Sequence, residues 1–113
     1  MIVANVKYFY EDMPKLEAFD YGDWIDVRAC GVKVDGGFAY WDYFDSIVYK
    51  QGQFLLIDLG FAMQCPDHYE AHVVPRSSTF KNYGLIQTNH QGVIDWSYRG
   101  DNDKWFVPMG AIS

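Results

Sequence analysis

Apolar residues recur at every second position along most of this chain, and that spacing constrains the fold more than any other feature. A period of two is typical of a β-strand with one buried face, because successive side chains point to opposite sides. The segment 25–30 alternates in this way, and no segment keeps the 3.6-residue period of an amphipathic helix. We therefore predict an all-β fold with at most one short helix, best placed at residues 77–83. Ser77 or Ser78 is expected to cap it, and Gly84 to end it.

Short strand-like runs are separated by turn-forming residues at close intervals. The runs lie at residues 38–49, 53–63, 69–74, 85–88, 92–94 and 105–107. Turn signals such as Asp35-Gly36-Gly37 and Gln51-Gly52 lie between them. Many short strands at close spacing favour a β-barrel or a β-sandwich. No linker, internal repeat or low-complexity tract interrupts the pattern, so we expect a single domain over residues 1–113.

The charge balance limits the partners of the chain. Nine Lys and Arg against fifteen Asp and Glu give a net charge of −6. A field of this sign opposes binding to nucleic acid or to an anionic membrane, so we expect neither as a partner. No apolar run reaches the roughly 18 residues of a membrane span, and the first residues lack the pattern of a secretory signal. These features predict a cytoplasmic protein, and any polyanionic ligand would need local cationic groups or a metal ion.

The two cysteines and three histidines give no sign of a disulfide framework or of a zinc site. We interpret Cys30 and Cys65 as free thiols in the core, with a disulfide between them as the alternative.

The segment RSSTFKNYG at residues 76–84 is more polar than a plain strand requires. Arg76 offers a planar fork of donors that suits phosphate. Ser77 and Ser78 add hydroxyl and backbone N–H groups at the expected start of the helix. The simpler interpretation is an ordinary capped turn with a surface arginine.

The segment GVIDWSYRG at residues 92–100 places a carboxylate at the end of an apolar run. Asp95 is well placed there to act as a general base or to bind a metal ion. Gly92 indicates a close backbone approach or a tight bend. The simpler interpretation is a β-hairpin in which Asp95 satisfies the hydrogen bonds of its own turn.

Taken together and in this order, the strings resemble the trimeric dUTPase family. GVIDWSYRG is similar to its third motif, G-V-I-D-x-x-Y-R-G, and RSSTFKNYG is similar to its second. IDVRA at 25–29 resembles the end of its first motif, A-G-x-D-L-R-A, with Asp23-Trp24 where Ala-Gly is usual. The stretch after the third motif resembles phage-type members. The resemblance implies a jelly-roll-like β-barrel of the β-clip type that assembles as a homotrimer with active sites between subunits.

The resemblance also implies an activity, the hydrolysis of dUTP to dUMP and pyrophosphate with Mg²⁺ as the cofactor. Asp95 would be the general base for the water that attacks the α-phosphorus, and Asp26 would contact Mg²⁺ through a water. Tyr98 would stack under the deoxyribose and leave no room for a 2′-hydroxyl. The other residues implied to bind the substrate are Arg76, Ser77 and Ser78 at the phosphates and Asn89, Gly92, Val93 and Ile94 at the uracil.

Two further motifs of the family, a G-x-R-x-x-Q segment and a Gly-rich tail with an Arg, do not occur before Ser113. This keeps open a first alternative, a non-catalytic nucleotide-binding or regulatory module of the same fold. A second alternative is the related dCTP deaminase. That branch carries a Glu soon after the third motif, whereas this chain has no Glu after Glu70, which disfavours deamination.

Overall fold

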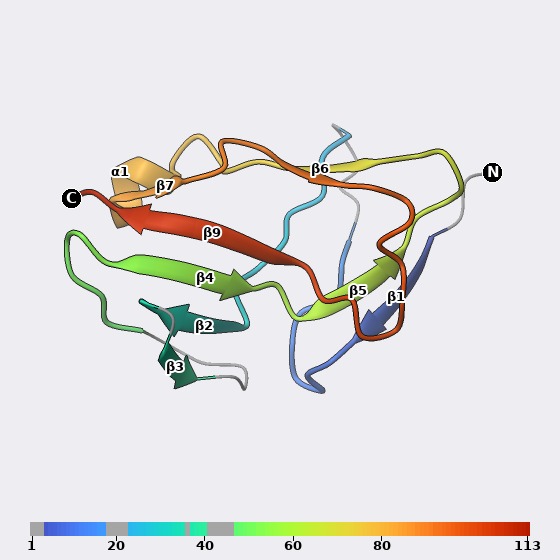
Figure 1. Ribbon diagram of the computed structural model, residues 1–113, viewed down its shortest axis with the longest axis horizontal. Coiled ribbons are helices and arrows are strands. Elements are labelled where there is room, and N and C mark those ends of the chain that lie inside the picture. Colours follow the sequence, from blue (N-terminus) through green and yellow to red (C-terminus); the bar gives the residue numbers. More distant parts are fainter. Residues whose placement is uncertain (1–3, 18–22, 36, 41–46) are drawn as a thin grey trace.

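The computed structural model describes residues 4–17, 23–35, 37–40 and 47–113, which form nine strands and one helix (Figure 1). The strands are β1 (Asn5–Tyr8), β2 (Gly31–Val34), β3 (Gly37–Tyr40), β4 (Phe54–Asp58), β5 (Phe61–Gln64), β6 (Ala71–Val73), β7 (Leu85–Gln87), β8 (Gly92–Ile94) and β9 (Phe106–Ala111), and the helix is α1 (Thr79–Tyr83). The prediction of an all-β fold with one short helix is confirmed. At five residues, α1 is far too short to cross a membrane, and the described part of the chain has no longer helix.

The strands form one five-stranded sheet and two ribbons, all antiparallel. The sheet has the order β3-β2-β4-β9-β7, and the ribbons are β1-β5 and β6-β8. In Figure 1, β4 and β9 run side by side through the middle of the molecule, with β1 and β5 at one end and β6 along the top. The molecule is elongated, at 44 × 26 × 25 Å. The chain therefore leaves the sheet after β4 and returns to it only with β7 and β9.

Among the described residues, the buried apolar side chains form two clusters. The larger lies where the ribbons meet the end of the sheet, and its buried members are Leu59, Phe61, Cys65, Trp105 and Val107. The rings of Phe61 and Trp105 lie 5.1 Å apart. The smaller cluster belongs to the five-stranded sheet and contains Val32, Leu55 and Ala111. Cys30 and Cys65 are both buried and free, as expected of thiols that serve packing.

Several strand boundaries differ from the prediction. The alternating segment 25–30 is not a strand, and Trp24 and Ile25 are 66% and 48% exposed. Only its last residue joins the sheet, where the Cys30 amide donates to the Asp58 carbonyl at 2.7 Å. The run 53–63 is broken at Gly60, whose φ of +84° bends the chain between β4 and β5. Residues 41–46 of the expected run 38–49 lie outside the described residues.

Helix α1 occurs within the predicted segment, but its start differs in detail. Ser78 occupies the N-cap position and makes no side-chain capping bond. The amide of Thr79 instead donates to the Arg76 carbonyl at 3.0 Å, so a backbone turn already satisfies it. Ser78 therefore lies at the N-cap, as predicted, but its side chain makes no capping hydrogen bond. Gly84 does end the helix, in the left-handed conformation with φ of 66°.

Candidate functional site

The β6-β8 ribbon positions the third polar segment. Its register sets Ala71 opposite Ile94 and Val73 opposite Gly92. Ala71, Val73 and Ile94 point inward and pack against the larger core cluster. The alternate residues point outward, so Val93 of β8 is exposed. The ribbon is thus fixed by its inner face and offers its outer face for binding.

Asp95 follows directly after β8 and has an exposed side chain. Its carboxylate accepts hydrogen bonds from the amide of Ser97, at 3.1 Å, and from the Ser97 hydroxyl. The Tyr98 amide donates to the Asp95 carbonyl at 3.0 Å and closes the turn. The two Ser97 hydrogen bonds lower the pKa of Asp95, because they stabilise its charged form. Asp95 therefore satisfies its own turn and is also an ionised acceptor at neutral pH.

Tyr98 and Arg99 continue this turn and are each held by a specific partner. The Tyr98 hydroxyl donates to the Lys104 carbonyl at 2.8 Å. Burial, followed by the charge of Asp103, raises the pKa of Tyr98, so its hydroxyl keeps its proton. Arg99 forms an ion pair with Asp67 at 2.5 Å and lies over the Trp96 ring. These contacts fix the positions of the Tyr98 and Arg99 side chains within the loop.

Arg76 and Asp26 form a second centre. The Arg76 guanidinium donates to the Asp26 carboxylate at 3.0 Å, which joins two segments that lie far apart in the sequence. The Arg76 side chain is 74% exposed, so most of its donors face solvent. Ser77 is exposed beside it and Ser78 is partly buried. Within the described residues, no group of three or more His, Cys, Asp or Glu side chains is arranged to hold a metal ion.

The two centres lie at opposite ends of the β6-β8 ribbon. Asp95 follows the end at which Ala71 faces Ile94, whereas Arg76 follows the end at which Val73 faces Gly92. Among the described residues, Asp26 contacts Arg76 and Asp95 contacts Tyr98, and no hydrogen bond or ion pair joins the two pairs.

The approach to β8 bends at His90 rather than at Gly92. His90 has a φ of 63°, and its amide donates to the Gln87 carbonyl at 3.0 Å. A Cβ atom on Gly92 would meet Val73 only at 3.5 Å, an ordinary contact, and the Asn89 side-chain amide at 3.7 Å. The expected tight bend at Gly92 is therefore wrong by two residues. Asn89 does lie beside the start of β8.

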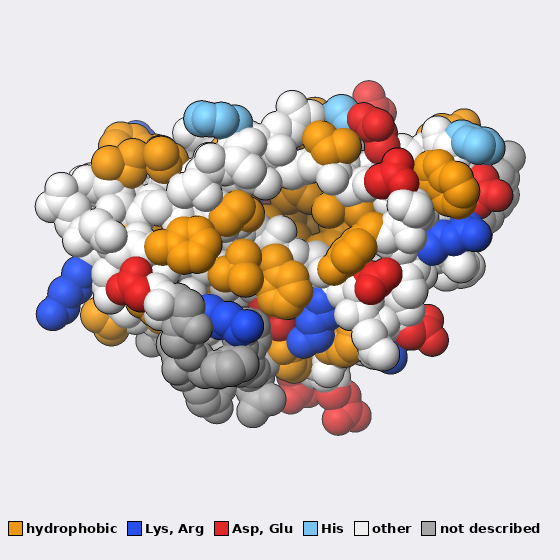
Figure 2. Space-filling view, in the orientation of Figure 1, with side chains coloured by type: hydrophobic (Ala, Val, Ile, Leu, Met, Phe, Trp, Pro, Cys, Tyr) orange, Lys and Arg blue, Asp and Glu red, His pale blue; other side chains and the backbone are white. Residues whose placement is uncertain are grey.

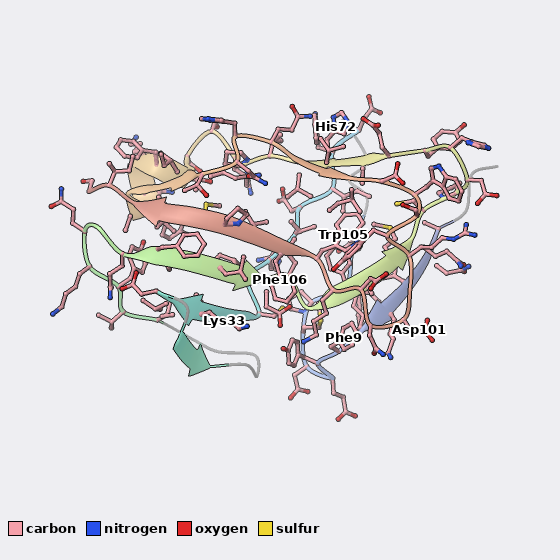
Figure 3. All side chains as sticks on the ribbon, in the orientation of Figure 1. Phe9, Lys33, His72, Asp101, Trp105 and Phe106 are labelled. Carbon is pink, nitrogen blue, oxygen red and sulfur yellow. The ribbon has the colours of Figure 1, made fainter. Side chains whose placement is uncertain are left out.

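A polar cluster on the outer face of the ribbon was missed from the sequence. The His72 ring contacts the Glu70 carboxylate through Nε2 and the Gln91 side chain through Nδ1, each at 2.5 Å. Figure 3 shows His72 projecting from the outer edge of the molecule. Glu70, just before β6, and His72, on β6, lie two residues apart, which was the available signal, but only the pairing with β8 reveals that Gln91 joins them.

Known proteins match this chain along most of its length. The dUTPase family model matches residues 43–104. The SPbeta prophage-derived deoxyuridine 5′-triphosphate nucleotidohydrolase YosS of Bacillus subtilis is 47% identical over 108 residues, which cover 96% of this chain and 66% of that protein. The deoxyuridine 5′-triphosphate nucleotidohydrolase of Thermoanaerobacter sp. is 34% identical over 66 residues, 58% of this chain and 45% of that protein. The Rickettsia felis protein of the same name is 40% identical over 64 residues, which cover 57% of this chain and 43% of that protein.

The chain belongs to the dUTPase family, since the family model covers more than half of it, from before β4 to the end of the loop that carries Tyr98. Its similarity to a prophage-derived protein agrees with the phage-type resemblance of the sequence. The chain spans less than two thirds of the length of these relatives.

Proposed function

We propose that this protein hydrolyses dUTP to dUMP and pyrophosphate. The observation that carries the proposal is the placement of Asp95 and Tyr98 on one turn at the end of β8, within a chain of the dUTPase family. The turn leaves the Asp95 carboxylate ionised and exposed. It also holds the Tyr98 ring by its hydroxyl. Asp95 would accept a proton from the attacking water, and the Tyr98 ring would form a flat surface against the sugar.

The uracil would be read by the backbone of β8. One edge of Gly92–Ile94 pairs with β6, and the strand order of the described residues leaves the other edge without a strand. An unpaired edge offers backbone N–H and C=O groups that pair with the polar edge of a pyrimidine. Asn89 lies next to Gly92 and would add a side-chain amide. The exposed Val93 would pack on the nucleotide or on a neighbouring subunit.

Asp95 would act as the general base. Its carboxylate would orient a water toward the α-phosphorus and accept the proton as the bond to the leaving pyrophosphate breaks. The Ser97 hydrogen bonds keep it ionised, so it is ready at any pH near neutrality. A lowered pKa makes Asp95 a weak base, so the positioning of the water matters more than the strength of the base.

The phosphates would be bound by Arg76, Ser77 and Ser78, and Asp26 would hold Mg²⁺ through a water. Mg²⁺ keeps several waters and takes other ligands from substrate phosphates, so a single carboxylate beside the phosphate-binding arginine fits it. The bound ion offsets the charge of the triphosphate, which the net charge of −6 otherwise repels. Asp26 and Arg76 lie in contact, so Mg²⁺ near Asp26 and a phosphate group bound to Arg76 would be neighbours.

The active site would be completed by a second copy of the chain in a homotrimer. Arg76 and Asp95 follow opposite ends of the β6-β8 ribbon, which supports a site that takes one of them from each of two copies. Exposed large apolar side chains on α1, β7, β8 and the residue after β9 support an interface too, since apolar patches are typical of contact surfaces. The exposed ones are Phe80, Tyr83, Ile86, Val93 and Ile112. Figure 2 shows apolar side chains across the middle of one face of the molecule.

The test is pyrophosphate release from dUTP with Mg²⁺, with UTP and dCTP as competing substrates. We expect turnover of dUTP alone, and a loss of about a hundredfold or more in kcat for Asp95→Asn. Asp101→Asn is the matched control, because it makes the same change in the same loop and should leave kcat unchanged. Turnover that survives Asp95→Asn would disprove the role of the base. Tight dUTP binding without turnover in the parent chain would instead identify a nucleotide-binding module.

A further inference from the structure

A buried charged cluster lies beneath the loop that carries Tyr98. Asp58, at the end of β4, has 0% exposure. Its carboxylate accepts three hydrogen bonds, from the Tyr10 hydroxyl at 2.6 Å, from the Lys104 ammonium at 3.2 Å and from the Gly60 amide at 2.8 Å. A buried carboxylate that is paired and hydrogen-bonded in this way is fixed in place, because any movement leaves a charge without a partner.

Lys104 joins this cluster to the loop. Its ammonium also donates to the Tyr10 hydroxyl at 3.2 Å and lies 4.7 Å from the centre of the Phe9 ring. The backbone carbonyl of the same residue accepts the hydrogen bond from the Tyr98 hydroxyl. In Figure 3, Asp101 lies at the edge of the molecule, while Trp105, next to Lys104, lies over the interior. The loop is therefore anchored where it returns, through the side chain of Lys104.

The anchor is continued by Trp105. Its amide donates to the Phe61 carbonyl at 3.0 Å, and its own carbonyl accepts from the Leu59 amide at 3.0 Å. Its ring is buried against Phe61. Lys104 thus stands between a backbone fixed to β5 and a side chain fixed to Asp58, and its carbonyl has a defined position.

We propose that Lys104, through its ion pair with Asp58, is a positioning residue that fixes the Tyr98 ring and so sets the discrimination between deoxyribose and ribose. The proposal rests on the proposed function for its substrate. A ring held only at its Cβ end swings about its side-chain torsions, whereas a second tether at the hydroxyl fixes the far end. A wall that excludes one hydroxyl group must be fixed to within about 0.5 Å, which explains why a tether to a buried charge matters here.

The experiment compares Lys104→Met and Tyr98→Phe with the full parent chain. Lys50→Met, at an exposed lysine just before β4, is the control. The first readout is the ratio of kcat/KM for dUTP to kcat/KM for UTP. The second is the ring resonance of Tyr98 in protein labelled with ¹³C-tyrosine, which needs no activity and is assigned by its absence in Tyr98→Phe. Both are measured at a temperature where circular dichroism shows every variant to be folded.

We expect the dUTP/UTP ratio to fall about tenfold in both variants and to stay unchanged in Lys50→Met. Tyr98→Phe keeps the ring and leaves Asp58 and Lys104 intact, so its effect would isolate the tether even if Lys104→Met folds poorly. The Tyr98 resonance should move toward its value in an unfolded chain in Lys104→Met. An unchanged ratio in Tyr98→Phe, or an unchanged resonance in folded Lys104→Met, would overturn the proposal. A parent chain that neither binds nor hydrolyses dUTP would overturn the proposed function, and the resonance would still decide whether Lys104 positions Tyr98.

Discussion

The two halves of the candidate site are held in place by opposite means. Asp26 and Arg76 meet in an ion pair whose arginine is 74% exposed. Asp95 and Tyr98 lie on a loop whose return is tied to Asp58, which has no exposure at all. Exposed pairs contribute little to stability and exchange partners readily, whereas a buried pair is costly to disturb. Under the proposed function, the half that would bind the phosphates is therefore free to reorganise around an ion and a ligand, while the half that would bind the sugar is built before the ligand arrives.

The largest effect is expected in the buried pair. Lys104→Met leaves the Asp58 carboxylate buried without its counter-charge and should lower the free energy of unfolding by about 3 kcal/mol. Adding Asp58→Asn removes the stranded charge and should recover part of that loss. Urea denaturation of both variants measures the difference. A double variant that is less stable than Lys104→Met alone would show that the charge of Asp58 is not what the lysine compensates.

Substitution in the exposed pair should change the binding of dUTP and leave the stability of the fold nearly unchanged. Arg76→Ala removes donors that face solvent, so we expect the free energy of unfolding to change by less than about 1 kcal/mol. The KM for dUTP should rise about tenfold or more, because hydrogen bonds to a charged phosphate contribute about 1.5 to 3 kcal/mol. Thermal unfolding and steady-state kinetics provide the two values, with Lys50→Ala as the control. A large loss of stability with an unchanged KM would reverse the contrast between the halves.

The smallest effect concerns the pH dependence of the Asp95 turn. The pKa of Asp95 is lowered in the folded protein, so its small contribution to stability is present at neutral pH and is lost as pH falls through that pKa. Ser97→Ala removes the hydroxyl bond and should raise the pKa of Asp95 toward its ordinary value. The acid limb of the kcat/KM profile should then move to higher pH, and a carboxyl ¹³C titration should move with it. An unchanged titration would mean that Ser97 does not set the charge of Asp95.

The elements that sequence alone identified are those whose signal is local. The apolar run of β8 ends at Asp95 within four residues, and the helix stops at a single left-handed glycine, so short stretches sufficed. The short strands β1 and β2 were not anticipated, because each is only four residues long with a lysine inside. The segment 25–30 alternates without forming a strand, since pairing partners rather than pattern decide whether a strand forms.

The buried cluster was beyond sequence reasoning for a physical reason. Tyr10, Asp58 and Lys104 come from three distant parts of the chain, and only the packing of the N-terminal ribbon against the loop after Tyr98 brings them together. Asp58 lies inside the apolar run 53–63, but nothing in the sequence identifies its counter-charge. The contact of Asp26 with Arg76 has the same origin, because it crosses from the first polar segment to the second.

The central claim is that dUTP is hydrolysed at a site shared between two copies of the chain. Mixing chains that carry Asp95→Asn with chains that carry Arg76→Ala, after joint unfolding and refolding, tests it directly. Each variant alone lacks one half of every site, whereas a mixed assembly contains sites with an intact Asp95 from one copy and an intact Arg76 from another. At a dUTP concentration well below the KM of the Arg76→Ala variant, we predict that the mixture releases pyrophosphate from dUTP well above the sum of the separate variants. A mixture no more active than that sum, from a parent chain that hydrolyses dUTP, would contradict the shared site.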